Sequence, residues 1–378
     1  MKVTLIYYQY PLYDRGSYIQ EQVDAVAALV EGVLLGATKY PAGAKFERPA
    51  TLTMAWVPRF KIPFLTDLLF DGLVFLKLLF SQKFWQSDLI HVVCARGILA
   101  GIMLKFVSRK PLVCTVEIIN PPTKSKQDAF FYSLQKWLFT RKSIDKIICW
   151  SHFHYEKYLK SWGIPKNKVV FISCGIDFNL FDYKTTGREI RAKYAIAPLD
   201  KLLVFAKPMY EYNRLSAELL LTAVSSLRRP DLKILCGGGQ QKALLQDYAK
   251  KIKFENSLFF MDPVPLSEIP KYLAAADLIV LPFTYEATTA RSFLESLAMK
   301  KPVIVTKMGE IQNLVENNDQ VLMVDPEVGA VAAAILVVLK DREFSDKIAE
   351  TGYKWVRSNY SIEHIATQTV SVYKNLVR

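Results

Sequence analysis

The part of the chain best suited to chemistry lies between residues 232 and 306, where apolar strand-like runs alternate with loops and helical patterns. The run 232–236 ends in three glycines, Gly237 to Gly239, which lack a Cβ and so let backbone N–H groups approach a ligand closely. A second run, 278–282, leads through a polar turn into a helix that carries one acidic side chain, Glu295. This order of segments predicts a nucleotide site.

Apolar runs that alternate with helical patterns extend along most of the chain, and this alternation is typical of parallel sheets covered on both faces. The expected strands are 3–8, 52–57, 89–93, 112–116, 146–150 and 169–172, and then 202–205, 232–236, 257–260, 278–281, 303–306 and 321–324. We therefore expect an α/β protein with two doubly wound, Rossmann-like domains. In such sheets the ligand crevice lies beyond the carboxyl ends of the strands, so facing domains are expected to place a cleft between them.

The length of the chain agrees with two domains, because 378 residues exceed what one hydrophobic core usually organises. The polar stretch 182–188 is the expected linker. We expect an N-terminal domain over 1–183 and a C-terminal domain over 184–355. The helical pattern at 356–378 is expected to pack back on the N-terminal domain and brace the two.

The net charge of +13 is uneven, since residues 1–183 carry 23 Lys and Arg against 14 Asp and Glu. A basic face suits phosphates, whether of nucleic acid, of an anionic membrane surface or of a phosphorylated small molecule. The alternative is a generally basic solvated surface. No DNA-binding or RNA-binding signature is present, so nucleic acid is not expected as a partner.

Five cysteines, an odd number, lie mostly inside apolar runs and are expected to be core residues in a reducing compartment. The chain opens directly as a strand, without the pattern of a secretory signal. We therefore expect a cytoplasmic protein, peripheral on the inner face of the cell membrane if it binds lipid. His91, His152 and His154 are expected to be structural or exposed rather than catalytic.

The apolar segment 63–80 is interrupted by Asp67, Asp71 and Lys77 before it reaches the length of a membrane span. On a helical wheel these charges occupy one wedge and leave a wide apolar face. The segment is expected to be a core-packing helix. The alternative is an interfacial helix that dips into lipid.

Several segments, taken in chain order, resemble the retaining glycosyltransferases of family 4, which have the GT-B fold of two facing Rossmann-like domains. Each segment is short, but the ordered series is specific and covers nearly the whole chain. The matching segments are 145–151, 169–177, 234–239, 274–282, 294–298, 301–304 and 359–362.

The resemblance implies roles for two glutamates. Glu295 matches the motif glutamate that accepts hydrogen bonds from the two ribose hydroxyls, and a carboxylate suits a diol because it has two acceptor oxygens. The other motif glutamate would fall at position 287, which is Ala287 here, so Glu286 is the nearest acid. Glu286 either contacts the donor sugar or is a displaced surface residue.

The resemblance also implies the groups that hold the diphosphate. Lys207 and Arg214 stand near the family's cationic pair, which stabilises the leaving group. The helix start at Thr288, Thr289, Ala290 and Arg291 replaces a glycine-rich turn, and its N–H groups suit a phosphate. A solvated Arg291 is the alternative.

Other positions follow from the same resemblance. Val264 lies in the loop whose backbone groups read the base. On the acceptor side, Arg15, Gly16 and Ser17 replace a Gly-Gly loop, and Glu117 stands where the family has a His. Glu117 either accepts the proton of the acceptor hydroxyl or binds a hydroxyl of the donor sugar. The alternative is a glutamate at a strand end that pairs with a lysine.

The resemblance implies a hexosyltransferase-type, retaining enzyme. Such an enzyme moves a sugar from a nucleotide-sugar donor, bound by the C-terminal domain, to a hydroxyl of an acceptor bound by the N-terminal domain. No cofactor and no metal are expected, because the loops lack the paired oxygen ligands that a divalent ion needs. The acceptor is expected to be lipid-linked or a cell-surface glycan precursor. The alternatives are a sugar-nucleotide epimerase or hydrolase on the same fold, and a non-catalytic nucleotide-sugar-binding subunit.

Overall fold

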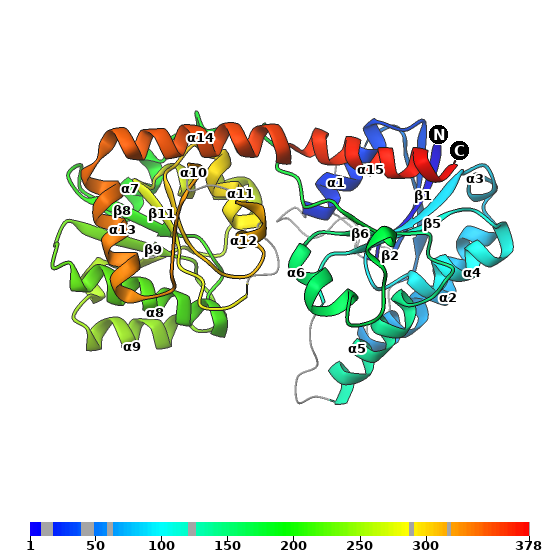
Figure 1. Ribbon diagram of the computed structural model, residues 1–378, viewed down its shortest axis with the longest axis horizontal. Coiled ribbons are helices and arrows are strands. Elements are labelled where there is room, and N and C mark those ends of the chain that lie inside the picture. The colour runs from blue at the N-terminus through cyan, green and yellow to red at the C-terminus, as the bar shows by residue number, and fades with distance from the viewer. Residues whose placement is uncertain are drawn as a thin grey trace. The chain divides into compact units, whose positions relative to one another are not determined.

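The computed structural model describes residues 1–8, 18–38, 49–58, 63–119, 126–286, 291–315 and 319–377. These residues form two compact units, one made of Met1–Gly175 with Ile362–Arg378 and the other of Ile176–Ser361. Each unit is built on its own parallel sheet (Figure 1).

Unit 1 contains a seven-stranded sheet in the order β3-β2-β1-β4-β5-β6-β7, and every neighbouring pair is parallel. Helix α15 packs against α1, while α2, α4 and α5 lie side by side as a separate layer. The strands are β1 (Lys2–Ile6), β2 (Gly32–Thr38), β3 (Leu52–Val57), β4 (Leu89–Val92), β5 (Leu112–Val116), β6 (Lys146–Cys149) and β7 (Val169–Phe171). The helices are α1 (Tyr18–Ala28), α2 (Pro63–Leu79), α3 (Gln82–Trp85), α4 (Ile98–Ser108), α5 (Lys126–Phe139), α6 (His152–His154) and α15 (Ile362–Val377).

Strand β2 was not among the strands expected from the sequence. It carries glycines at both Gly32 and Gly36, which weaken a strand pattern. A Cβ at position 36 would lie 2.5 Å from Cγ2 of Val74, so this glycine lets α2 pack directly on the sheet. Val74 and Leu78 are fully buried there, as expected for a core-packing helix.

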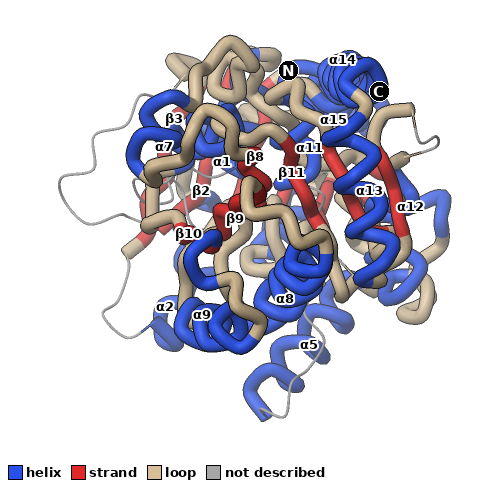
Figure 2. The backbone as a smooth tube through the Cα atoms, turned by 90° about the vertical axis from the view of Figure 1, so that its left-hand side faces the viewer, coloured by secondary structure: helices blue, strands red, loops and turns tan. Residues whose placement is uncertain are grey.

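Unit 2 contains a six-stranded parallel sheet in the order β10-β9-β8-β11-β12-β13, and its helices flank these strands (Figure 2). All six strands coincide with runs expected from the sequence, to within a residue at either end. The strands are β8 (Lys201–Phe205), β9 (Leu232–Cys236), β10 (Leu258–Phe260), β11 (Leu278–Leu281), β12 (Val303–Thr306) and β13 (Leu322–Val324). The helices are α7 (Arg188–Lys193), α8 (Glu211–Ser226), α9 (Lys242–Lys251), α10 (Ile269–Ala274), α11 (Arg291–Ala298), α12 (Ile311–Leu314), α13 (Val328–Lys340) and α14 (Arg342–Tyr360).

The division between the units falls after Gly175, earlier than the expected boundary at 183/184. The backbone N–H of Ile176 donates to the carbonyl of Tyr360 at 2.8 Å, and the ring of Tyr183 lies 5.1 Å from that of Tyr353. These contacts attach residues 176–183 to unit 2. The C-terminal segment expected over 356–378 is likewise divided, because α14 ends in unit 2 and α15 belongs to unit 1.

Among the described residues, no helix combines the length and the apolar character needed to cross a membrane.

Candidate functional site

In the sheet of unit 2, β9 lies beside β8 on one side and β11 lies beside it on the other, so the order of the strands reverses direction at this point. In a doubly wound sheet a ligand crevice forms beyond the carboxyl ends of the strands at such a switch point. Lys207 follows β8 and Phe283 follows β11, and the Lys207 ammonium lies 5.8 Å from the centre of the Phe283 ring. The switch point therefore has a cation at its edge.

Three charged side chains gather beside this edge. Burial lowers the pKa of Lys207, and the nearby carboxylate of Glu295 acts in the opposite direction. Nε of Arg291 donates to Oε1 of Glu295 at 2.7 Å, and both side chains are only 11% exposed. Both residues lie in α11, one turn apart, so the pair is set by the helix itself. The i,i+4 spacing of Arg291 and Glu295 is the sequence signal that indicates this ion pair.

Arg214 lies in the first turn of α8, and its guanidinium pairs with Glu218 one turn further along. Its Nε is buried, and the described residues provide no hydrogen-bond acceptor for it. Glu218 therefore balances the charge of Arg214, while Nε of Arg214 is a donor suited to a ligand oxygen.

The start of α8 is fastened to the loop after β11 by contacts that the sequence did not reveal. The hydroxyl of Tyr285 donates to Oδ1 of Asn213 at 2.8 Å, and the backbone N–H of Thr284 donates to Oγ of Ser216 at 3.1 Å. These bonds connect the first turns of α8 to the loop after β11, beside the switch point. Glu286, the next residue in the described chain, is exposed.

The glycines after β9 allow a close contact between two loops. A Cβ at Gly237 would lie 2.0 Å from the carbonyl oxygen of Lys207, and one at Gly239 would lie 2.8 Å from the backbone nitrogen of Met209. The N–H of Gly237 donates to the carbonyl of Phe205 at 3.1 Å. The missing side chains thus let the loop after β9 pack against the loop that carries Lys207. They help to position Lys207, and the approach of the loop's backbone to a ligand stays a prediction.

Six of the predicted site residues lie outside the described residues: Arg15, Gly16, Ser17, Thr288, Thr289 and Ala290. Val264 lies half-buried in the loop between β10 and α10. Within the described part of the chain, no group of three or more His, Cys, Asp or Glu side chains is arranged to hold a metal ion.

In unit 1, Glu117 follows β5 and is half-buried. It lies near Cys94, which follows the neighbouring strand β4. Burial, with a smaller contribution from the Glu117 carboxylate, raises the pKa of the Cys94 thiol to about 11. The predicted acceptor-side carboxylate is thus at a carboxyl strand end, the edge where ligands bind in such sheets.

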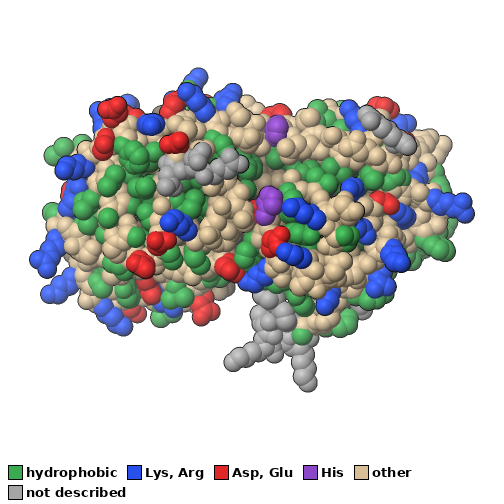
Figure 3. All heavy atoms as spheres, viewed as in Figure 1, with side chains coloured by type: hydrophobic (Ala, Val, Ile, Leu, Met, Phe, Trp, Pro, Cys, Tyr) green, Lys and Arg blue, Asp and Glu red, His purple; other side chains and the backbone are tan. Residues whose placement is uncertain are grey.

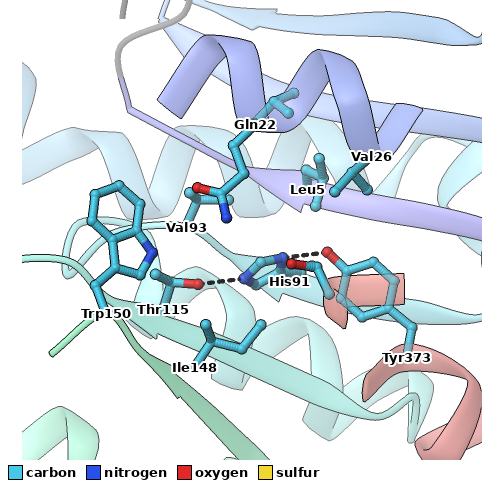
Figure 4. A pocket seen from close by; sticks show the side chains of 11 residues that line it. Leu5, Gln22, Val26, His91, Val93, Thr115, Ile148, Trp150 and Tyr373 are labelled. Atoms are coloured by element: carbon cyan, nitrogen blue, oxygen red, sulfur yellow. Dashed lines mark hydrogen bonds between the residues drawn. The ribbon is translucent and has the colours of Figure 1, made fainter. Parts of the chain in front are cut away.

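Unit 1 also contains an open pocket with an empty volume of about 330 Å³, lined by strands β1, β4, β5 and β6 and by helices α1 and α15 (Figure 4). Its polar centre is His91, whose Nδ1 lies 2.6 Å from the hydroxyl of Tyr373 and whose Nε2 lies 2.7 Å from Oγ1 of Thr115. Burial lowers the pKa of His91 to about 3, so the imidazole is neutral at pH 7. This chain of hydrogen bonds joins α15 to the sheet.

Two protein-family models match the chain. The model described as Glycosyltransferase Family 4 matches residues 17–180, and the model described as Glycosyl transferases group 1 matches residues 187–355. Together they account for most of the chain.

Curated relatives agree with these matches. An uncharacterized glycosyltransferase of Methanocaldococcus jannaschii is 25% identical over 297 residues, which span 76% of this chain and 75% of that protein. A GDP-mannose-dependent alpha-(1-6)-phosphatidylinositol monomannoside mannosyltransferase of Mycobacterium tuberculosis is 24% identical over 229 residues, and the match spans 58% of each protein.

Among solved structures, that of Anabaena HepE in complex with UDP superposes with a TM-score of 0.77 over 100% of both chains, at 19% identity. This likeness shows the fold, which is the GT-B fold of two Rossmann-like domains. With both domains matched by their own family models, the chain belongs to the group 1 glycosyltransferases of family 4.

Proposed function

We propose that this protein is a retaining, metal-independent glycosyltransferase that uses a nucleoside diphosphate sugar and needs no cofactor. The observation that carries the proposal is the cluster of Lys207, Arg291 and Glu295 beside the switch point of unit 2. It combines two cations suited to a diphosphate with one carboxylate suited to a ribose diol.

The carboxylate of Glu295 is the proposed ribose ligand. Its Oε1 already accepts a hydrogen bond from Arg291, which fixes the orientation of the carboxylate. We therefore assign the ribose hydroxyls mainly to Oε2. A carboxylate oxygen can accept more than one hydrogen bond, so both ribose hydroxyls can donate to the Glu295 carboxylate.

Lys207 is the proposed main stabiliser of the leaving group. The side chain of Lys207 is half-buried and its pKa is lowered by desolvation, so water screens its charge less than at the surface and its interaction with a departing phosphate is strengthened. Arg214 adds the buried Nε donor, and Arg291 adds a guanidinium at the start of α11. Backbone groups near Val264 are assigned to the base.

In the proposed reaction the acceptor hydroxyl attacks the anomeric carbon from the face that the diphosphate leaves, so the configuration is retained. The bond between the anomeric carbon and the phosphate oxygen breaks, and the leaving phosphate takes up the proton of the hydroxyl. Glu286 is assigned to the donor sugar's hydroxyls and Glu117 to the acceptor. No protein carboxylate forms a covalent intermediate.

We propose a lipid-linked acceptor or a cell-surface glycan precursor, used at the cytoplasmic face of a membrane. The M. tuberculosis relative is named for a phosphatidylinositol-based acceptor, which supports this choice. The basic surplus of residues 1–183 suits the phosphate groups of such molecules.

The first test is a thermal-shift screen of nucleoside diphosphates and their sugars. A ligand present at about 100 times its dissociation constant adds about 2.7 kcal/mol of stability. UDP and its sugars are the first choice because the solved structure of HepE contains UDP, and GDP-mannose is the second because the M. tuberculosis relative is GDP-mannose-dependent. The best donor is then incubated with an acceptor panel, and the anomeric configuration of the product is read by NMR.

The outcomes separate the candidate functions. An α-linked product from an α-linked donor supports retention, and an inverted product contradicts it. Turnover without any acceptor indicates an epimerase or hydrolase. Donor binding without turnover across the panel indicates a non-catalytic binding subunit.

A further inference from the structure

Helix α2 has apolar side chains on two opposite faces. Val74 and Leu78 are fully buried against the sheet of unit 1. Leu69, Leu76 and Phe80 follow one another at helical spacing and are exposed, with Phe80 at 83%. The second face is not needed for the core.

The neighbouring helices α4 and α5 continue this exposed apolar surface. On α4, Leu99 and Phe106 are two turns apart, and Phe106 is 86% exposed. On α5, Phe130, Leu134 and Trp137 have the spacing i, i+4, i+7, and Phe130 is 61% exposed. Because α2 packs against α4 and α4 against α5, the three faces belong to one layer. We call this surface, with the adjoining α3, the aromatic layer.

The concentration of aromatic side chains here is not a random scatter of surface residues. Among all side chains that the structure describes, every exposed Phe and Trp lies in the aromatic layer; elsewhere the large exposed apolar residues are Leu, Val, Ile and Tyr. An apolar patch of this kind on a folded domain marks an interaction site. The six are Phe80, Trp85, Phe106, Phe130, Phe131 and Trp137.

The aromatic layer is also basic. Residues 63–142 contain eleven Lys and Arg against five Asp and Glu. Lys77, Arg109, Lys136 and Lys142 are exposed, and the guanidinium of Arg141 lies 4.3 Å from the centre of the Trp137 ring. Figure 3 shows basic side chains among hydrophobic ones on the side of unit 1 where α2, α4 and α5 lie in Figure 1.

We propose that the aromatic layer docks unit 1 on an anionic lipid membrane. Trp side chains insert at the level of the headgroups, where an amphipathic ring is best accommodated, and Phe side chains enter the boundary with the acyl chains. Lysine and arginine side chains reach the phosphates from helices whose apolar faces lie in the interface. Asp71, which could oppose an anionic surface, instead accepts a hydrogen bond from the N–H of Ala100 at 2.8 Å, at the start of α4.

A membrane fits the composition better than a second protein chain does. Lysine is depleted in protein–protein interfaces, whereas the aromatic layer carries exposed lysines beside its rings. Anionic lipid attracts such lysines and so pairs the same residues with a complementary charge. The inference concerns where unit 1 attaches, and it holds whichever sugar is transferred.

The experiment is co-sedimentation of the full chain with vesicles of phosphatidylcholine alone and of phosphatidylcholine mixed with phosphatidylglycerol. We expect binding to the anionic vesicles, weakened by high salt. Two aromatic substitutions, Phe106→Ser with Phe130→Ser, should weaken binding about tenfold or more because they remove the inserted rings. Lys136→Glu with Lys142→Glu should weaken it by a similar factor through charge alone.

A matched control is Leu199→Ser with Leu244→Ser, which removes two exposed apolar side chains from unit 2 and should leave vesicle binding unchanged. Nucleotide-induced thermal shifts on the same preparations report unit 2 separately. Absence of vesicle binding with nucleotide binding intact overturns the membrane inference and leaves the proposed function standing. Self-association that the aromatic substitutions abolish would overturn it in favour of an interface between two copies of the chain.

Discussion

The proposed ribose contact of Glu295 leads to a quantitative prediction for Glu295→Gln. Gln has the same shape and can still accept a hydrogen bond from Arg291, but it has lost the charge that strengthens the bond to a hydroxyl. A hydrogen bond to a charged group contributes about 1.5 to 3 kcal/mol. The dissociation constant of the preferred nucleoside diphosphate should therefore rise about 10- to 150-fold.

The substitution also removes the charge partner of Arg291, which is only 11% exposed, so some loss of stability is expected. Binding must therefore be separated from folding. Calorimetric titration with the normal nucleotide and with its 2′,3′-dideoxy analogue makes this separation, because the analogue has no ribose hydroxyls. The native protein should bind the analogue weakly, and Glu295→Gln should bind both nucleotides about equally.

Glu343→Gln, on an exposed position of α14, is the matched control and should leave both affinities unchanged. If Glu295→Gln weakens both nucleotides by the same factor, the carboxylate acts on the fold of the site and does not bind the ribose. If it weakens neither, the assignment of Glu295 is wrong.

Three further predictions follow from other parts of the structure. Lys207→Met should lower kcat about 10²- to 10³-fold, as expected for the loss of a preorganised charge donor, whereas Lys207→Arg should retain part of the rate. If Lys207→Met and the native protein have equal kcat values, the proposed role of Lys207 is wrong. Gly237→Ala places a Cβ 2.0 Å from a backbone oxygen, so thermal denaturation should show that the free energy of unfolding falls by about 1–3 kcal/mol. Gly329→Ala, in open space on α13, should not lower the free energy of unfolding. His91 is buried and neutral with a pKa near 3, so the unfolded chain binds more protons at mildly acidic pH. The free energy of unfolding should therefore fall as pH drops below about 6.5, by about 1.4 kcal/mol per pH unit. Denaturant titrations of His91→Gln should lack this slope. The same slope in the variant would show that His91 does not cause it.

Most of the strands could be predicted from the sequence because buried parallel strands are continuous apolar runs bounded by polar or glycine-rich turns. Strand β2 was not predicted, because the reason for its glycines lies in the packing of a helix on the sheet. Gly36 weakens the local strand pattern, and its purpose becomes clear only when Val74 of α2 is seen to occupy the space of its missing side chain.

The helix α2 shows the limit of periodicity in another way. Its wide apolar face indicated either core packing or an interfacial helix, and the structure shows a buried face together with an exposed one. The exposed face gains meaning only beside α4 and α5, which are separated from α2 in sequence but adjacent in space.

In the candidate site, the sequence indicated Glu295, Lys207 and the glycines after β9 through the spacing of segments and the family resemblance. The packing role of the glycines was not predicted, because a sequence does not show which backbone will come close to them. Their neighbour is the loop of Lys207, 30 residues earlier in the chain.

By itself the sequence determined the two Rossmann-like domains, the family and the candidate nucleotide-binding residues, since local hydrophobic patterns and short motifs encode these. Tertiary structure alone decided that residues 176–183 join unit 2, that Asn213 holds Tyr285, and that three helices share one aromatic layer. These features depend on contacts between distant segments. Such contacts are set by how whole elements pack, and no local pattern of residues records them.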